Sequence, residues 1–319
     1  MGIYSVLNMK LGFVGLGRMG NAMVLNLLEK GVDVVAFNRT ASKINDLKSE
    51  FENSKKVESG ELIPAFTVEE LVRQLETPRI IWLMIPQGPP VDEMIGKLLL
   101  ARLVEGDMII DGGNCFYKDS QRHYTELKAK GINYLDVGTS GGLTGARNGA
   151  CLMIGGDEES YKKFEPLFKS MACEEGYAYF GPAGAGHFVK MVHNGVEYGM
   201  LQALGEGFEV LQKGPFKLDF EKAAHNWSHG SVVRGWLTEL LEKAFKSDPK
   251  LDEIEGVVGG GTTGRWTTDV AKELGVETPV MVDSIKAREQ SQTKPTFAGK
   301  VVAALRNQFG GHELKKVKS

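Results

Sequence analysis

The chain has 319 residues, more than one hydrophobic core usually supports, so two domains are expected. A formal net charge of -3 and a pI near 6.1 give no overall electrostatic reason to bind nucleic acid or an anionic membrane. Three cysteines are too few for a disulfide framework and favour a reducing compartment, which indicates the cytoplasm. The sequence has no uninterrupted apolar run of membrane-spanning length, and residues 1–8 are interpreted as an extension before the first strand.

Residues 10 to about 180 alternate short β-rich runs with helical stretches, a pattern typical of a doubly wound parallel sheet with crossover helices. After a turn-rich run at residues 181–186 the chain reads helical. We therefore predict an α/β dinucleotide-binding domain over residues 9–182 and an all-α domain for substrate binding and dimerisation over residues 183–319. Strands are expected at Leu11 to Gly15, Val32 to Phe37, Ile80 to Ile85, Met108 to Asp111, Asn133 to Val137, Cys151 to Ile154 and Tyr177 to Phe180. Helices are expected in the second domain near residues 187–212, 219–245, 267–275, 280–290 and 297–308.

The first strand leads directly into a glycine-rich turn that opens an amphipathic helix. In this setting the G-x-G-x-x-G spacing is typical of a Rossmann nucleotide site, because glycines let the backbone turn tightly and approach a pyrophosphate at the positive helix end. The alternative is a tight turn without a ligand. The residues expected at the cofactor are Gly15, Leu16, Gly17, Arg18, Met19 and Gly20.

The second strand ends in Asn38-Arg39-Thr40, where an NAD-specific fold usually has an acid that binds the ribose 2′-hydroxyl. A guanidinium with two small polar neighbours suits a 2′-phosphate, which favours NADP, with NAD possible. An ordinary exposed arginine is the alternative.

Ile85, Pro86 and Gln87 form another turn at the carboxyl edge of the sheet, where ligands of such folds bind. Because two prolines follow, the alternative is that this turn has a purely structural role and binds no ligand.

Two further turns follow strands, at Asp111-Gly112-Gly113-Asn114 and at Gly138-Thr139-Ser140-Gly141-Gly142. We expect Asn114 to bridge substrate and nicotinamide, and the Ser140 hydroxyl with the following backbone N–H groups to bind a carboxylate. Tight turns are the alternative for both. Cys115 has no adjacent base and is interpreted as a small buried thiol rather than a nucleophile.

The predicted helix that begins near residue 187 carries Lys190, His193, Asn194 and Glu197 on one stripe, two turns long. Apolar residues occupy most of the remaining circumference, so this stripe is expected to face a cleft. There, a lysine of lowered pKa could accept a proton and a carboxyl of raised pKa could return one. A solvated helix face is the alternative.

These motifs together resemble a decarboxylating 6-phosphogluconate dehydrogenase of the short type, within the β-hydroxyacid dehydrogenase superfamily. The resemblance extends from Met9 to His312. Its most specific part is Lys190 followed by His193-Asn194 and Glu197-Tyr198. Further runs that resemble the family are Gly264-Arg265-Trp266-Thr267, Ala287-Arg288 and Arg306-Asn307-Gln308-Phe309-Gly310-Gly311-His312.

The resemblance implies oxidative decarboxylation of 6-phospho-D-gluconate to ribulose 5-phosphate, without a metal, in the oxidative pentose phosphate pathway. Lys190 would take the C3 hydroxyl proton and later polarise the keto oxygen, and Glu197 would protonate C1. His193 and Asn194 would bind the hydroxyl and orient the lysine. Substrate binding is implied for Ser140, Gly141 and Gly142 at the carboxylate and for Tyr198, Thr263 and Arg288 at the phosphate.

The resemblance also implies that Arg306 and His312 enter the site of a neighbouring subunit, which makes a homodimer, or a higher oligomer built from it, part of the active site. One departure stands out, since Gly261 occupies the position where long forms have a phosphate-binding lysine. Two alternatives stay open: a non-decarboxylating β-hydroxyacid dehydrogenase or reductase acting on a small acid, and a noncatalytic dinucleotide-binding protein.

Overall fold

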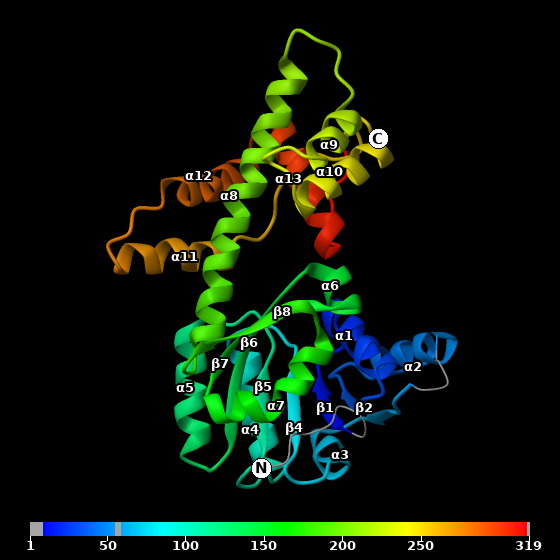
Figure 1. Ribbon diagram of the computed structural model, residues 1–319, viewed down its shortest axis with the longest axis vertical. Helices are drawn as coiled ribbons and strands as arrows, with labels where there is room; N and C mark the ends of the chain where they lie inside the picture. The colour runs from blue at the N-terminus through cyan, green and yellow to red at the C-terminus, as the bar shows by residue number, and fades with distance from the viewer. Residues whose placement is uncertain (1–8, 55–58, 318–319) are drawn as a thin grey trace. The chain divides into compact units, whose positions relative to one another are not determined.

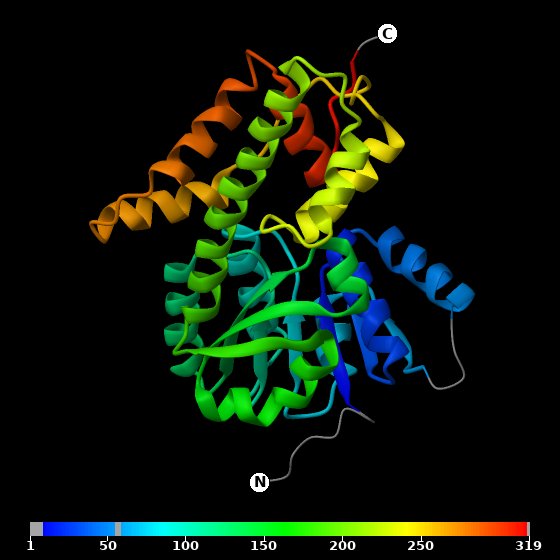
Figure 2. The same cartoon turned by 45° about the horizontal axis from the view of Figure 1, so that its top comes forward.

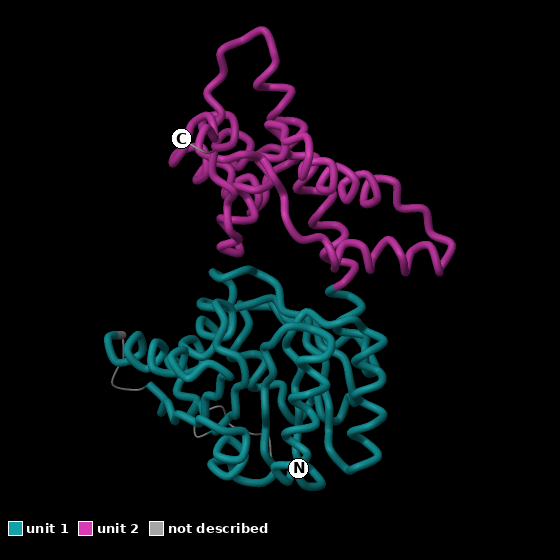
Figure 3. Tube along the Cα trace, turned by 180° about the vertical axis from the view of Figure 1, so that it is seen from behind, with its two compact units in different colours: residues 1–190 teal, residues 191–319 magenta. Residues whose placement is uncertain are grey.

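The computed structural model describes residues 9–54 and 59–317, so the extension predicted for residues 1–8 lies outside the described residues. The described chain forms two compact units that meet in sequence between Lys190 and Met191, coloured separately in Figure 3. The change from unit 1 to unit 2 falls inside one long helix, α8 (Ala185–Lys213).

Unit 1 is built on an eight-stranded sheet of order β3-β2-β1-β4-β5-β6-β7-β8, with helices on both faces (Figures 1 and 2). Neighbouring strands from β3 through β6 all pair in parallel, as the sequence pattern predicts. The strands are β1 (Lys10–Val14), β2 (Asp33–Phe37), β3 (Leu62–Ala65), β4 (Ile80–Leu83), β5 (Met108–Asp111), β6 (Asn133–Ser140), β7 (Ala150–Gly156) and β8 (Ala172–Gly181).

The last two strands correct the expectation of a fully parallel sheet. Strand β7 runs antiparallel to β6, and β8 runs parallel to β7. The connection between β6 and β7, residues 141–149, is shorter than the dozen or so residues that a parallel crossover needs. The chain therefore turns back at the end of β6.

Each face of the sheet has its own buried core, because alternate side chains of a strand point to opposite faces. Phe13 packs with residues of α1, α2 and α7, whereas the next residue, Val14, packs with residues of α3, α4 and α5. The helices of unit 1 are α1 (Arg18–Glu29), α2 (Ser42–Ser54), α3 (Val68–Arg73), α4 (Pro89–Leu100), α5 (Tyr117–Lys128), α6 (Gly142–Asn148) and α7 (Glu158–Met171).

The described part of unit 2 consists of helices and one isolated bridge between Ile254 and Lys316. Phe208, Leu241, Phe245 and Leu305 lie in its buried core. The helices are α9 (Phe220–Ser228), α10 (Trp236–Ser247), α11 (Thr262–Glu273), α12 (Pro279–Gln290) and α13 (Phe297–Gly310), after the C-terminal part of α8.

Two helix predictions in this unit were wrong in detail. The single helix expected over residues 219–245 is divided into α9 and α10, with Gly230 at a φ of 81° in the break. The helix expected near 267–275 begins earlier, at Thr262, directly after Gly261. Among the described residues, no helix combines the length and apolarity that crossing a membrane requires.

Candidate active site

The three glycines of the first turn have three different roles. Gly15 has a φ of 102°, and a Cβ there would lie 2.3 Å from the Met84 carbonyl oxygen. A Cβ on Gly20 would lie 1.9 Å from the Gly15 carbonyl oxygen, so the start of α1 packs directly on the turn. A Cβ on Gly17 would meet no atom within 4 Å. The turn is thus tight at its ends and open at its centre, where a pyrophosphate backbone could approach.

The start of α1 can attract an anion. Gly17 is its N-cap and makes no side-chain cap hydrogen bond, and the first turn contains no acidic residue. Unpaired backbone N–H groups at a helix start carry a partial positive charge. The geometry fits the phosphates of a dinucleotide.

The side chain of Asn38 holds this turn in place. The Leu16 N–H donates to Asn38 Oδ1 at 2.9 Å, and Asn38 Nδ2 donates to the Thr40 carbonyl at 3.1 Å. Both ends of the Asn38 amide are therefore used within the protein. Arg39 and Thr40 are exposed beside it, so the guanidinium expected at a 2′-phosphate is accessible.

The turn after β4 lies against the same glycines, since a Cβ on Gly15 would be 2.7 Å from Ile85 Cγ2. Pro86 and Gln87 are exposed next to Ile85. The two prolines that follow occupy the first positions of α4, which is the structural use of proline that the sequence left open.

The loop that ends in Asn114 is fixed by buried groups. Asp111 Oδ1 accepts a hydrogen bond from the Gly113 N–H at 3.1 Å. A Cβ on Gly112 would lie 2.2 Å from Trp82 Nε1, so only glycine fits over that ring. Asn114 itself is exposed at the carboxyl edge of the sheet. Cys115 is buried as predicted, and burial, followed by the nearby Asp111, raises its pKa, which disfavours a nucleophilic role.

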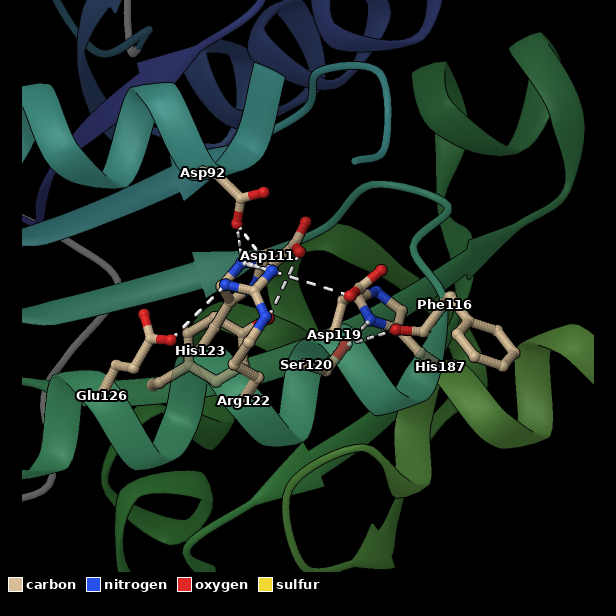
Figure 4. A network of polar contacts seen from close by, with 10 residues as sticks. Asp92, Asp111, Phe116, Asp119, Ser120, Arg122, His123, Glu126 and His187 are labelled. Atoms are coloured by element: carbon tan, nitrogen blue, oxygen red, sulfur yellow. Dashed lines mark hydrogen bonds and ion pairs between the residues drawn. The ribbon is translucent and has the colours of Figure 1, made fainter. Parts of the chain in front are cut away.

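A polar network behind this loop was not foreseen from the sequence. Asp92 on α4 accepts a hydrogen bond from Arg122 Nη2 at 2.7 Å and lies 2.7 Å from His123 Nε2. The His123 ring packs edge-on against Tyr134, whose hydroxyl donates to Asp111 Oδ2 at 3.2 Å. Figure 4 shows Arg122 and His123 of α5 reaching toward Asp92, with Asp111 close by. The network connects α4 and α5 to the Asn114 loop.

The end of β6 leads into the turn that the sequence predicts to bind a carboxylate. Ser140 is partly buried at the last position of the strand. Gly141 is the N-cap of α6 with a φ of 113°, and a Cβ there would lie 3.0 Å from the Gly145 Cα. The backbone of this turn therefore requires glycine.

A buried carboxylate anchors the start of α8. Asp136 in β6 accepts hydrogen bonds from the Gly184 N–H at 2.7 Å and from the His187 N–H at 2.8 Å. The His187 Nδ1 lies 2.7 Å from the Ser120 hydroxyl of α5, a pair drawn in Figure 4. Burial raises the pKa of Asp136, while His187 and the two backbone donors oppose this rise. These contacts fix the helix turn just before Lys190.

Lys190 lies against a strand that has no side chain at the point of contact. A Cβ on Gly138 would be 2.3 Å from Lys190 Cβ. Gly155 and Gly186 make similarly close backbone contacts between β7 and α8. Only 8% of Lys190 is exposed, so little of this residue is accessible to water.

The polar stripe of α8 continues into unit 2 as predicted. Asn194 is 6% exposed and follows Lys190 by one turn. His193 Nδ1 lies 3.1 Å from Asn194 Oδ1 and 4.0 Å from a carboxylate oxygen of Glu197. Gly195, on the adjoining face, is covered by Thr267 of α11, whose hydroxyl donates to the Met191 carbonyl at 2.6 Å.

Unit 2 brings together the residues expected at the phosphate. The guanidinium carbon of Arg288 lies 3.7 Å from the centre of the Tyr198 ring, a cation–π contact. The Tyr198 hydroxyl is 3.3 Å from the Thr263 hydroxyl. Arg288 is 5% exposed, and its Nη1 is buried with no hydrogen-bond partner in the described structure. Such a donor is suited to an oxyanion.

Arg306 lies near the same place in its own chain. A Cβ on Gly260 would be 3.2 Å from Arg306 Nη2, and one on Gly261 would be 3.7 Å from Arg288 Cδ. Burial, followed by the charge of Arg288, lowers the pKa of Arg306. The His312 ring packs edge-on against the Phe309 ring.

The presence of glycine at position 261, where long forms of the family have a lysine, also has a structural reason. This residue is the N-cap of α11 with a φ of 134°, a conformation that a lysine would adopt only with strain. Among the described residues, no cluster of three or more histidine, cysteine, aspartate or glutamate side chains could hold a metal ion.

The fold and this set of residues define a dinucleotide-dependent oxidoreductase with a helical second domain. The Mycobacterium tuberculosis 3-hydroxyisobutyrate dehydrogenase shares the fold, with a TM-score of 0.71 at 20% identity, over 92% of this chain and 98% of that chain. Residues 10–181 match the NAD binding domain of 6-phosphogluconate dehydrogenase, and residues 186–318 match the C-terminal domain of the same enzyme. The chain belongs to the 6-phosphogluconate dehydrogenase family.

Individual relatives agree with this assignment. A Bacillus subtilis protein provisionally named 6-phosphogluconate dehydrogenase YqeC is 45% identical, over 97% of this chain and 100% of its own length. The Haloferax volcanii protein named NAD(+)-dependent, decarboxylating 6-phosphogluconate dehydrogenase is 39% identical, over 97% of this chain and 99% of its own. The solved Plasmodium falciparum 6-phosphogluconate dehydrogenase, described in apo form and with NADP+ and 6-phosphogluconate, has a TM-score of 0.80 at 34% identity. That match covers 88% of this chain and 62% of the Plasmodium chain.

Proposed function

We propose that this chain converts 6-phospho-D-gluconate to ribulose 5-phosphate and carbon dioxide with reduction of NADP or NAD, in the oxidative pentose phosphate pathway. The observation that carries the proposal is the polar face of α8, on which Lys190 and Asn194 are almost fully buried and Glu197 follows within two turns. A noncatalytic nucleotide-binding protein has no need to bury a lysine in this way. The decarboxylating activity named for the Haloferax relative supports the same substrate.

In the proposed reaction Lys190 accepts the proton of the C3 hydroxyl, and the bound nicotinamide serves as the hydride acceptor for C3. The 3-keto acid that results loses carbon dioxide once its keto oxygen is polarised, and protonated Lys190 supplies that polarisation. Glu197 then donates a proton to C1 of the enediol. His193 and Asn194 bind the hydroxyl and hold the lysine in register.

The two anionic ends of the substrate have separate binding groups. Ser140 with the backbone of Gly141 and Gly142 binds the carboxylate that is lost. The buried and unpartnered Nη1 of Arg288 supports binding of the phosphate, with Tyr198, Thr263, Arg306 and His312 as the remaining proposed partners. Asn114 contacts both substrate and nicotinamide in this proposal.

The cofactor preference rests on Arg39. Its exposed guanidinium at the end of β2 suits the 2′-phosphate of NADP. Pro86 and Gln87 would line the same cofactor. The name of the Haloferax relative specifies NAD(+), so a preference for NAD is the competing outcome.

We further propose a cytoplasmic homodimer. The proximity of Arg306 to Arg288 within one chain supports a phosphate site completed in its own subunit, in place of the exchange between subunits that the family resemblance implies. Mixed dimers of Lys190→Ala and Arg306→Ala chains separate the two arrangements. Exchange would restore one working site in each mixed dimer, whereas own-chain completion restores none, which is the result expected here.

The first experiment measures steady-state turnover of 6-phosphogluconate with NADP and with NAD while released carbon dioxide is trapped. Nicotinamide reduction matched by equimolar carbon dioxide is the expected result. Reduction without carbon dioxide, or activity only on unphosphorylated 3-hydroxy acids, would identify a non-decarboxylating β-hydroxyacid dehydrogenase. No turnover of either substrate class would favour the noncatalytic interpretation.

A further inference from the structure

Two exposed cysteines lie on neighbouring strands of unit 1. Cys151 is in β7 and Cys173 is in β8, and both are free and exposed, whereas Cys115 is buried. Strands β7 and β8 pair in parallel with Ala150 opposite Ala172, and each cysteine is the next residue after this pair. Both cysteines therefore follow the same paired rung, at the point where the register shifts so that Leu152 lies opposite Tyr177.

The spacing of these strands suits a disulfide. Adjacent strands lie about 4.8 Å apart, and bridged cysteines have Cα atoms about 4.4–6.8 Å apart. Cys173 lies in the irregular part of β8, residues 173–176, which is opposite Cys151. A Cβ on Gly176 would lie 2.4 Å from Cys173 Sγ and 3.0 Å from the Ala150 carbonyl oxygen, so Gly176 lies between the sulfur and the residue that precedes Cys151.

The electrostatic surroundings of Cys151 agree with this placement. Burial, followed by Cys173, raises the pKa of the Cys151 thiol, and the charge of Lys190 opposes the rise. Cys151 is therefore within the electrostatic range of both the second cysteine and the proposed catalytic lysine. In the antiparallel ladder it also pairs directly with Ser140.

We propose that Cys151 and Cys173 form a dithiol that hydrogen peroxide converts to an intrachain disulfide, and that this bond lowers the activity of the site formed with Ser140 and Lys190. The Cys173 thiolate attacks a peroxide oxygen to give a sulfenic acid and hydroxide, which takes up a proton to become water. The second thiol displaces the sulfenic oxygen as water and forms the S–S bond. Two thiols are oxidised, one peroxide is reduced, and two waters are released.

The effect on activity follows from strand geometry. A disulfide fixes the Cβ atoms about 3.8 Å apart with a dihedral near 90°, so closing the bond ties Cys151 of β7 to a fixed position relative to β8. Ser140 shares the ladder with Cys151 and ends the strand that contacts Lys190 through Gly138. Displacements of about 1 Å in such positions can cost on the order of 100-fold in rate. The proposed consequence for activity rests on the proposed function, whereas the disulfide itself does not.

The decisive measurement is the mass of the full chain after treatment with hydrogen peroxide, before and after reduction by dithiothreitol. The expected result is a loss of two hydrogens per chain, with Cys151 and Cys173 in one linked peptide and full reversal on reduction. Absence of that linkage, a link to Cys115, or a bridge between two chains would overturn the pairing. This test gives its answer whether or not the chain acts on 6-phosphogluconate.

The consequence is tested by comparing kcat/KM for 6-phosphogluconate in treated and untreated samples of each variant. Wild type and the Cys115→Ser control should lose about tenfold or more, reversibly. Cys151→Ser and Cys173→Ser should retain most of their own untreated rate, because neither can close the bond. An oxidised wild type with unchanged kcat/KM would overturn the regulatory role, whereas an untreated wild type without turnover would contradict the proposed function alone.

Discussion

The backbone of Gly138 lies directly against the side chain of Lys190. A Cβ at residue 138 would be 2.3 Å from Lys190 Cβ and 2.9 Å from its Cγ, distances at which atoms overlap. Lys190 cannot easily move away, because Asp136 holds the start of α8 through two backbone hydrogen bonds. The lack of a side chain at Gly138 in β6 therefore determines the position of the Lys190 amine.

Replacing Gly138 by alanine should shift Lys190 and lower kcat strongly. Overpacking of this kind costs about 1–3 kcal/mol of stability, and a displacement near 1 Å costs on the order of 100-fold in rate. The KM for the nicotinamide cofactor should change little. Steady-state kinetics and thermal unfolding of Gly138→Ala measure both effects.

The matched control is Gly96→Ala on α4, where a new Cβ would meet nothing within 4 Å. This variant should be unchanged in kcat and slightly more stable, by roughly 0.5–1 kcal/mol, since alanine favours a helix interior over glycine. Normal turnover in Gly138→Ala would contradict the positioning role of that glycine.

Lys190→Ala should remove turnover while leaving cofactor binding nearly intact. General acid–base groups contribute about 100- to 10,000-fold, so kcat should fall at least within that range. Binding is measured by titration of nicotinamide fluorescence, and Lys162→Ala, at an exposed lysine of α7, is the control. Loss of cofactor binding together with activity would mean that Lys190 is structural.

Gly17→Ala should weaken cofactor binding without weakening the fold. Gly17 has a φ of -68° and open space at its Cβ position, so alanine fits the protein itself. The new methyl would occupy the approach of the pyrophosphate, and a cost of about 1–3 kcal/mol corresponds to roughly 5- to 150-fold in Kd. Unfolding and cofactor titration separate this variant from Gly15→Ala, which should destabilise the chain because of its φ of 102°.

Arg39→Asp should reverse the cofactor preference. Removing a charged hydrogen-bond partner of the 2′-phosphate costs about 1.5–3 kcal/mol, so kcat/KM with NADP should fall by roughly 10- to 100-fold, and kcat/KM with NAD should fall much less. Lys43→Asp makes the same charge change at an exposed lysine of α2 and should affect both cofactors equally. Equal losses with both cofactors in Arg39→Asp would show that this arginine does not read the 2′-phosphate.

The local patterns of the chain predicted most of the sheet, the glycine turn and the stripe on α8, because each depends on residues close in sequence. Strand β3 escaped prediction, since it has four residues, includes Pro64 and lies at the edge of the sheet with only one residue buried. The reversal of β7 is a consequence of a short connection rather than of any residue pattern.

The supports of the site could not be predicted from local sequence, because their partners are far apart in the chain. Asp136 binds the N–H groups of residues 184 and 187, and His187 pairs with Ser120. The sequence predicts a cofactor contact for Asn38, and the structure adds that its amide holds the glycine turn. A polar residue at a strand end is compatible with both roles, and only the three-dimensional contacts distinguish them.

Asp92 should contribute to stability in a pH-dependent manner. Burial raises the pKa of this carboxyl, but hydrogen bonds and charges from His123 and Arg122 together lower it below its ordinary value of 3.8. At pH 7 the folded protein therefore gains from the ionised carboxylate, and this gain is lost as pH falls below 3.8 through the lower folded-state pKa.

Asp92→Asn should thus be less stable than wild type at pH 7 by about 1 kcal/mol or less, because the carboxylate is partly exposed. This difference in stability should shrink as pH falls. Urea unfolding at several pH values measures it, with Glu93→Gln, at the exposed neighbour on α4, as the control. A difference that is constant from pH 7 to pH 3 would mean that Asp92 acts through packing rather than through its charge.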